Sequence, residues 1–358
     1  MKQTAIVVGA GVMGRLLSLR LVESGWAVTL VDRNAEPGEN SCTWTGAGML
    51  SPYCEREASE RLITDLGIYS IERWPAILKS LAQPVFHKSL GSLVVAHPKD
   101  RDELGRLHRR VLERSVRPDQ MREVSGPELE ALEPELGQRF SSGLYFPFEQ
   151  HLDNRDLLAA LAATLRARGV ELRFNTEATA LDVQAVQLGS ETLTADWVFD
   201  CRGLGAANEL AELRGVRGEI LYLSAPDVRL SRPVRLMHPR YSIYIVPRAN
   251  NIYLVGATMI ESDDLGPITA RSALELLSAA YSIHPGFAEA RLIETSANCR
   301  PGFPDNHPRL IAKPGLLRIN GLFRHGFLIS PALADFVIEY LESGTIHPMA
   351  ERLWRTAS

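Results

Sequence analysis

The strongest constraint on the fold is a glycine-rich turn near the start of the chain, Gly9-Ala10-Gly11-Val12-Met13-Gly14. The turn matches the pattern G-x-G-x-x-G and stands between an apolar run at 4–8 and a helical run at 15–24. An apolar run without polar alternation is typical of a strand that is buried on both faces of a parallel sheet. Gly11 lets the backbone approach a pyrophosphate, and the following helix offers free N–H groups and the positive end of its dipole. These features predict that the turn binds a dinucleotide.

An acidic residue completes this unit. The second apolar run, 27–31, ends at Asp32, about 20 residues beyond the turn, where a carboxylate meets a ribose hydroxyl in such folds. The alternative is a glycine-rich turn in an unrelated α/β protein, which would leave the position of Asp32 as a coincidence.

The rest of the chain favours FAD over NAD as the dinucleotide. A nicotinamide enzyme would continue with further β-α units, whereas residues 34–53 are irregular and contain many small residues. A second glycine turn, 201–205, which includes Gly203, follows a predicted strand at 195–200. Two turns of the nucleotide-binding kind with one G-x-G-x-x-G indicate a single large cofactor held by both.

The predicted fold class is α/β plus α+β, because short strands separated by turn residues replace the first pattern between 218 and 258. We expect a Rossmann-like FAD-binding domain with a parallel sheet, interleaved with a substrate domain built on a mostly antiparallel sheet. The FAD-binding domain would comprise 1–82, 141–214 and 304–358, and the substrate-binding domain 83–140 and 215–303. Periodicity predicts helices at 57–81, 99–113, 126–136, 154–168, 270–281 and 331–341, and strands at 84–96, 170–174, 219–223, 241–247, 252–256, 291–297 and 316–320. Asn154 is expected to cap the helix that it begins.

The composition and charge of the chain argue against several classes of binding partner. The net charge is −4 among 358 residues, without long runs of one sign, so no nucleic-acid or anionic-membrane surface is expected. The apolar runs are shorter than the ~20 residues of a membrane span. Four separated cysteines without a CxxC pair predict free thiols, no metal site and a cytoplasmic location. A small molecule is the expected partner.

Several motifs in consecutive order resemble the D-amino-acid oxidase superfamily of flavoproteins, and most closely the glycine oxidases associated with thiamine biosynthesis. The motifs are VVGAGVMG at 7–14, TWTGAGML at 43–50, LEALEPEL at 129–136, YIVPR at 244–248, LVGATM at 254–259, RPGFPD at 300–305 and GLFRHGFLISPA at 321–332. The resemblance covers essentially the whole chain.

The resemblance implies a set of residues that bind FAD non-covalently. Val12, Met13, Asp32 and Arg33 would contact its adenosine end, Thr43, Ala47, Gly48 and Met49 would lie near the diphosphate and flavin, and a backbone group of Ala178 would meet the adenine. The residues that would wrap the flavin ring are Leu322, Phe323, Arg324, His325, Gly326, Phe327 and Leu328. Some relatives attach flavin to a cysteine, but the register of Cys299 differs by one residue.

The resemblance also implies a substrate site. Arg300 would bind the substrate carboxylate, because a planar guanidinium fork forms two parallel hydrogen bonds with it. Tyr244 and Arg324 would lie beside it, and Met49 and Met259 would line a narrow apolar pocket. Each role has a plain alternative, which is a surface arginine for Arg300, packing for Tyr244, an interdomain ion pair for Arg324 and core filling for the methionines.

The expected reaction is oxidation of glycine or a similar small primary or secondary amino acid, with hydride transfer to flavin N5. The products would be an imine or 2-oxo acid, ammonia or an amine, and H2O2, since O2 is the acceptor that the resemblance implies. Relatives are often homotetramers or dimers, but the sequence does not determine whether this chain is a homo-oligomer. The alternatives are a dehydrogenase of the same fold that uses another acceptor, with a D-amino acid, sarcosine or an imino acid as substrate, and a non-enzymatic dinucleotide-binding protein. Three departures from the family leave the substrate open: Asp32 replaces a glutamate, Ser242 replaces a histidine, and 295–298 lacks a tryptophan.

Overall fold

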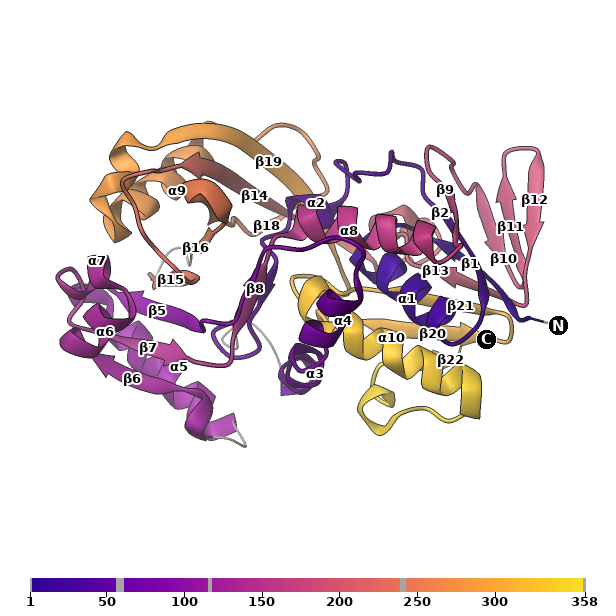
Figure 1. Ribbon diagram of the computed structural model, residues 1–358, viewed down its shortest axis with the longest axis horizontal. Coiled ribbons are helices and arrows are strands. Elements are labelled where there is room, and N and C mark those ends of the chain that lie inside the picture. Colours follow the sequence, from indigo (N-terminus) through magenta and orange to yellow (C-terminus); the bar gives the residue numbers. More distant parts are fainter. Residues whose placement is uncertain (1, 56–60, 115–117, 239–242, 357–358) are drawn as a thin grey trace.

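The computed structural model describes residues 2–55, 61–114, 118–238 and 243–356. Figure 1 shows two large sheets toward opposite ends of the long axis of the molecule. In the described part of the chain one sheet has seven strands and the other has nine. The predicted fold class is confirmed, and the candidate site lies where the two sheets approach each other.

The seven-stranded sheet contains the glycine-rich turn. Its strands, in spatial order, are β22 (Trp354–Thr356), β20 (Arg309–Lys313), β21 (Leu316–Asn320), β13 (Trp197–Asp200), β1 (Thr4–Val8), β2 (Ala27–Val31) and β9 (Glu171–Arg173). All neighbours are parallel except β20 and β21. The carboxyl ends of β1, β2 and β13 therefore meet at one edge, which is where open α/β sheets bind their ligands.

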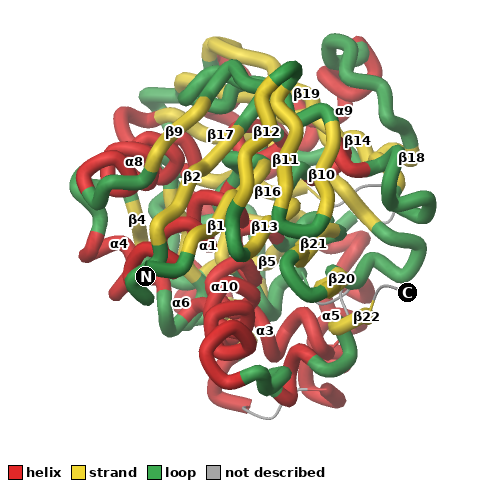
Figure 2. Tube along the Cα trace, turned by 90° about the vertical axis from the view of Figure 1, so that its right-hand side faces the viewer, coloured by secondary structure: helices red, strands yellow, loops and turns green. Residues whose placement is uncertain are grey.

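Both faces of this sheet are covered, which explains the unbroken apolar runs. Along β1, Ala5 and Val7 pack into a cluster with helices, whereas Ile6 and Val8 pack into a second cluster with a small sheet. The helices are α1 (Val12–Glu23), α8 (Asn154–Ala167), α10 (Gly326–Ser343) and α3 (Arg61–Ile71). The small sheet is β10 (Ala180–Asp182), β11 (Ala185–Leu188) and β12 (Glu191–Thr194), which lie side by side in Figure 2 and which the sequence pattern did not predict.

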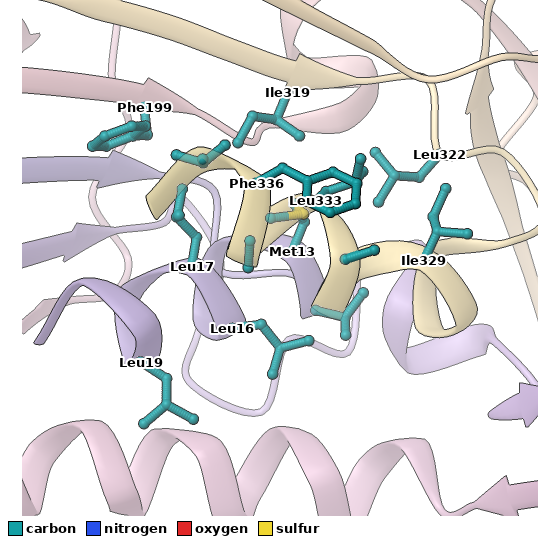
Figure 3. Close-up of a cluster of buried hydrophobic side chains, with 14 of the residues drawn as sticks. Met13, Leu16, Leu17, Leu19, Phe199, Ile319, Leu322, Ile329, Leu333 and Phe336 are labelled. Carbon is teal, nitrogen blue, oxygen red and sulfur yellow. The ribbon is translucent and has the colours of Figure 1, made fainter. Parts of the chain in front are cut away.

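The packing of α1 against α10 fixes the N-terminus of each helix at the pocket. Figure 3 shows Met13 of α1 beside Leu333 and Phe336 of α10, with Phe199 and Ile319 on the strand side. The prediction that α10 begins at Pro331 is wrong, because the helix begins five residues earlier. A proline inside a helix leaves one carbonyl without its N–H partner, and here the indole of Trp74 donates to the Phe327 carbonyl at 3.1 Å.

The nine-stranded sheet is mostly antiparallel, as predicted. Its strands are β18 (Ile260–Glu261), β14 (Arg214–Ser224), β17 (Ile252–Gly256), β16 (Ile243–Pro247), β15 (Val234–Met237), β5 (Ser92–Ala96), β7 (Ser142–Phe146), β6 (Arg122–Ser125) and β19 (Arg291–Gly302), which pairs with β14. Helices α9 (Ala270–Ile283), α6 (Gly126–Leu132) and α7 (Pro134–Gly137) pack on one face, and α5 (Arg101–Arg114) packs on the other. Because β7 hydrogen-bonds to β5 and β6, this sheet includes residues that the expected boundary at 140/141 assigns to the FAD-binding domain.

Local differences from the predicted elements have local causes. The run at 57–81 contains two helices, α3 and α4 (Trp74–Ser80), and its residues 57–60 lie outside the described part. The run at 126–136 breaks at Glu133, which is extended, since the residue before a proline avoids helical geometry. Asp153, not Asn154, caps α8 by accepting from the N–H groups of Arg155 and Asp156.

A second small sheet lies between the two large ones (Figure 1). It contains β3 (Met49–Leu50), β8 (Gln150–Leu152) and β4 (His87–Lys88), and α2 (Cys42–Thr45) precedes β3. Short 3-10 turns span Pro98–Asp100, Pro118–Gln120, Gly203–Ala206, Ala249–Asn251, Pro285–Glu289 and Pro348–Ala350.

None of the described helices is long and apolar enough to cross a membrane. The four cysteines are free thiols, as predicted.

Candidate active site

A pocket extends from the carboxyl edge of the seven-stranded sheet to the face of the nine-stranded sheet. Its walls come from the turns after β1, β2 and β13, from α2 and the start of α10, and from β14, β16 and β19. Segments far apart in the sequence therefore line one continuous cavity.

Asp32 lies at the first end of the pocket, together with Arg33 and Ala178. Its carboxylate accepts a hydrogen bond from the Ala10 N–H at 2.5 Å and another from the Asn34 N–H at 2.7 Å. Each carboxylate oxygen has a further lone pair. The contacts orient Asp32 and leave acceptor capacity for a ribose hydroxyl.

The glycines of the first turn have two different roles. Gly9 and Gly11 line the pocket, and a Cβ built on Gly11 would lie 3.1 Å from the Thr43 hydroxyl. That hydroxyl accepts from the Val12 N–H at 3.1 Å, which places Thr43 at the start of α1. Gly14 does not line the pocket, and a Cβ there would lie 1.8 Å from the Gly9 carbonyl oxygen. Gly14 therefore permits close packing of the helix on the turn.

The second glycine turn is fixed by buried charges. Asp200 at the end of β13 is fully buried and forms ion pairs with Arg202 at 2.8 Å and Arg318 at 3.3 Å. The side chain of Asn320 donates to the Gly203 carbonyl at 2.9 Å. Gly203 and Arg202 both line the pocket, and the second turn lies directly beside the first, because β13 pairs with β1.

Arg300 extends from β19 into the other end of the pocket. Its guanidinium lies directly over Gly218 of β14, where a Cβ would come within 2.3 Å of Nη2. Nη1 lies 3.3 Å from the Thr258 carbonyl oxygen, and no carboxylate in the described residues forms an ion pair with Arg300. A partly buried guanidinium without an anionic partner is a ready site for a carboxylate.

Tyr244 of β16 lies beside Arg300 and also lines the pocket. Burial raises the pKa of the Tyr244 phenol, while the nearby Arg300 opposes that rise. Burial also lowers the pKa of Arg300, although a guanidinium stays protonated in proteins. The pair therefore presents a hydroxyl donor and a cation to the same region of the pocket.

Arg324 differs from Arg300 because it has an anionic partner. Its Nη2 donates to Glu55 Oε1 at 2.6 Å, and both side chains are largely buried. The attraction of Glu55 raises the pKa of Arg324. His325 Nδ1 lies 3.9 Å from the other Glu55 oxygen, and burial lowers the pKa of His325 to about 4.

The structure brings most of the expected site residues together. The predicted residues that line the pocket are Gly9, Gly11, Val12, Met13, Asp32, Arg33, Thr43, Ala47, Gly48, Met49, Ala178, Gly203, Tyr244, Arg300, Leu322, Phe323, Arg324, Gly326 and Phe327. His325 and Leu328 are buried but do not line it, because their side chains pack behind the wall. Met259 does not line it either: its side chain is 60 % exposed, with its sulfur 4.0 Å from Arg324 Nη1.

Other lining residues were not predicted from the sequence. Glu55 lies five residues beyond the motif TWTGAGML and belongs to no motif itself, so only its contact with Arg324 reveals it. Gly218 carried a usable signal, because a glycine within a strand marks a close approach of another group. Cys42 and Cys299 also line the pocket. Ser242 lies outside the described residues.

The residues fit a dinucleotide with a flat ring system. The pocket joins a ribose acceptor, two glycine turns that let the backbone approach phosphates, and the N-termini of α1 and α10. Gly46 keeps the wall open beside Phe327, since a Cβ there would lie 2.8 Å from that ring. Arg300, Tyr244 and Arg324 lie at the far end, where a substrate would meet the ring.

Comparisons with known proteins agree with this arrangement. A family model described as FAD dependent oxidoreductase matches residues 4–340. An oxidoreductase of Rhizobium etli named for thiamine biosynthesis, ThiO, is 45 % identical over 336 residues, which are 94 % of this chain and 95 % of that protein. A glycine oxidase of Pseudomonas aeruginosa is 29 % identical over 363 residues, again 94 % and 95 % of the two chains.

Solved structures share the fold over nearly the whole chain. The glycine oxidase of Geobacillus kaustophilus superimposes with a TM-score of 0.83 at 23 % identity, covering 95 % of each chain. The iminodiacetate oxidase of Chelativorans sp. BNC1 gives a TM-score of 0.85 at 25 % identity and covers 98 % of this chain and 99 % of that one.

Proposed function

Because the chain belongs to the family of FAD dependent oxidoreductases of the D-amino-acid oxidase type, which act on C–N donors, we propose that it oxidises glycine or a similar small amino acid. The substrate would be a primary or secondary amine with a carboxylate, and O2 would be the electron acceptor. The glycine oxidase of Pseudomonas aeruginosa supports this substrate class. The name of the Rhizobium etli relative supports a role in thiamine biosynthesis.

Arg300 is the observation that carries the proposal. Its partly buried guanidinium faces the pocket without an ion-pair partner in the described residues, and Tyr244 supplies a hydroxyl beside it. A substrate carboxylate would supply the anionic partner that Arg300 lacks among the described residues. The contact fixes the α-carbon of the substrate at the flavin end of the pocket, so catalysis by positioning is expected.

FAD, when bound, supplies the redox chemistry by accepting a hydride from the α-carbon and passing two electrons to the acceptor. The residues that would hold it are Asp32 at the ribose, Gly11 and Thr43 at the phosphates, and the pocket-lining residues 322–324, 326 and 327 at the ring. The substrate amine would have to bind without its extra proton, because the nitrogen lone pair forms the C=N bond of the imine. The imine hydrolyses to a 2-oxo acid and ammonia or an amine.

The N-terminus of α10 adds an electrostatic contribution. Gly326 and Phe327 line the pocket at the start of this helix of 18 residues. The first N–H groups of a helix have no partners within it and carry partial positive charge. They would stabilise negative charge that develops on a ring bound beside them.

The test is to mix purified protein with glycine, sarcosine, D-alanine, D-proline and iminodiacetate, with and without oxygen. Anaerobic bleaching of the flavin absorption and aerobic peroxide from one small amine are expected. Bleaching without peroxide would replace the oxidase by a dehydrogenase that uses another acceptor. Protein without flavin absorption, or without bleaching by any amine, would contradict the proposed function.

A further inference from the structure

The two arginines at the substrate end of the pocket differ in one respect. Arg324 already forms an ion pair with a carboxylate, whereas Arg300 forms none with the described residues. We propose that Glu55 is a specificity-determining residue: by pairing with Arg324 it leaves Arg300 as the guanidinium available to substrate and reserves the pocket for amines with one carboxylate. The inference rests on the proposed function, and it deepens that function by naming the charge class of the substrate.

The pairing of Glu55 with Arg324 is short and sheltered from solvent. The bond from Arg324 Nη2 to Glu55 Oε1 measures 2.6 Å, and the two side chains are 18 % and 10 % exposed. Arg324 lowers the pKa of Glu55 although burial alone would raise it. Glu55 is therefore a carboxylate at neutral pH, and it lines the pocket together with its partner.

The chain segment that carries Glu55 is held in place from behind. The N–H groups of Tyr53 and Cys54 donate to one oxygen of the buried Glu149, at 2.9 Å and 2.7 Å. The guanidinium of Arg235 donates to the Cys54 carbonyl from the neighbouring strand. These contacts fix the backbone at residues 53 and 54, so the position of Glu55 does not depend on its bond to Arg324 alone.

Within the described part of the chain, the other ionisable groups near Glu55 do not provide a second free cation in the pocket wall. His325 is neutral at pH 7, because burial lowers its pKa to about 4. Arg235 is buried behind the wall and does not line the pocket. Among the described residues at this end, the charged groups that line the pocket are Arg300, Arg324 and Glu55, with a net charge of one positive.

This charge balance distinguishes between two kinds of substrate. The carboxylate of glycine or sarcosine pairs with Arg300 and brings the site close to neutrality. A dicarboxylate adds a second anion that meets a guanidinium already bound to Glu55, and a buried carboxylate without a partner is strongly disfavoured. The pocket should therefore exclude a dicarboxylate because of its second negative charge, and not because of its larger size.

The experiment separates charge from size with a matched pair of substrates. Iminodiacetate and its monoamide have almost the same volume, but only the first has two carboxylates. Anaerobic reduction of the bound flavin measures kcat/KM for each without involving the acceptor. The holoenzyme, E55Q, E55D and the control E294Q are compared. Glu294 forms an ion pair with Arg155 at 2.5 Å and does not line the pocket.

The holoenzyme is expected to prefer the monoamide by about tenfold or more, because specificity here is the cost of one unpaired charge. E55Q frees Arg324 and should reduce that preference by about tenfold or more, whereas E55D and E294Q should keep it. A purely structural role of Glu55 would slow both substrates equally. A preference of the holoenzyme for iminodiacetate, or an unchanged ratio in E55Q, would overturn the inference.

Failure of the proposed function can be distinguished from failure of this inference. If no amine reduces the flavin, the proposed function is wrong. The charge rule is then tested with malonamate and malonate, whose binding is measured by the shift of the flavin absorption. Tighter binding of malonamate supports the rule, and tighter binding of malonate overturns it. The wild-type ratios decide the question even if E55Q does not fold.

Discussion

The two ends of the pocket are assembled in different ways. At the nucleotide end, Gly9, Gly11 and Asp32 come from one β-α-β unit, and parallel pairing of β1 with β2 brings them together. At the substrate end, Arg300, Tyr244, Arg324 and Glu55 come from four separate segments. The first end depends on backbone geometry, whereas the second depends on the pairing of charges, so substitutions should affect the two ends differently.

The largest expected effect is at the substrate end. Arg300→Ala removes the partner of the substrate carboxylate, and loss of one member of a buried charged pair costs about 2–5 kcal/mol. KM for a carboxylate substrate should rise at least ~30-fold, measured by anaerobic flavin reduction, while the affinity for FAD stays unchanged. Arg300→Lys keeps the positive charge but cannot form two parallel hydrogen bonds with the carboxylate. Its KM should therefore lie between the values for the wild type and for Arg300→Ala. An unchanged KM would remove Arg300 from the substrate site.

The next effect tests the backbone geometry of the nucleotide end. Gly14→Ala places a Cβ 1.8 Å from the Gly9 carbonyl oxygen, and such overpacking costs about 3 kcal/mol. Urea unfolding of the apoprotein should show this loss without any cofactor. Gly105→Ala is the control, because only the far end of Arg109 lies near that helical glycine. Equal stability of the two variants would contradict the packing role of Gly14.

Acid should destabilise the substrate end through His325. Burial lowers its pKa from 6.5 to about 4, so the unfolded chain takes up a proton before the folded protein does. Stability from this group is present above the unfolded pKa and is lost as pH falls toward 4, by about 2 kcal/mol between pH 7 and pH 5. Urea unfolding at both pH values should show a smaller loss in His325→Asn. An equal loss of stability between pH 7 and pH 5 in the wild type and in His325→Asn would exclude His325 as the cause of the acid destabilisation.

The smallest effect is expected at Asp32. Asp32→Asn keeps the shape of the side chain but removes a charged acceptor for the ribose, which contributes about 1.5 kcal/mol. The Kd for FAD should rise about tenfold, measured by titrating apoprotein with FAD. Asp32→Glu keeps the carboxylate and should bind more tightly than Asn. If Asn binds FAD as well as Asp does, the ribose contact is absent.

The sequence pattern predicted the nucleotide end of the pocket well because the residues that form it lie close together in the chain. A strand, a glycine turn, a helix and an acid follow one another within about 30 residues, and each element lies where that pattern indicates. The start of α10 was misplaced because Pro331 resembles a first helical residue, whereas the carbonyl it leaves free is satisfied by Trp74 from another helix. No local rule could anticipate that contact.

Glu55 shows what only the folded structure decided. It belongs to no sequence motif, and its contact with Arg324 joins residues 269 positions apart. The parallel core, the glycine turns and the residue types suited to FAD follow from the sequence alone, because backbone conformation and hydrophobic periodicity are set over a few neighbouring residues. Folding brings Glu55 to Arg324 and leaves Arg300 without an anionic partner among the described residues, because charge pairing depends on distances between segments that the chain order does not specify.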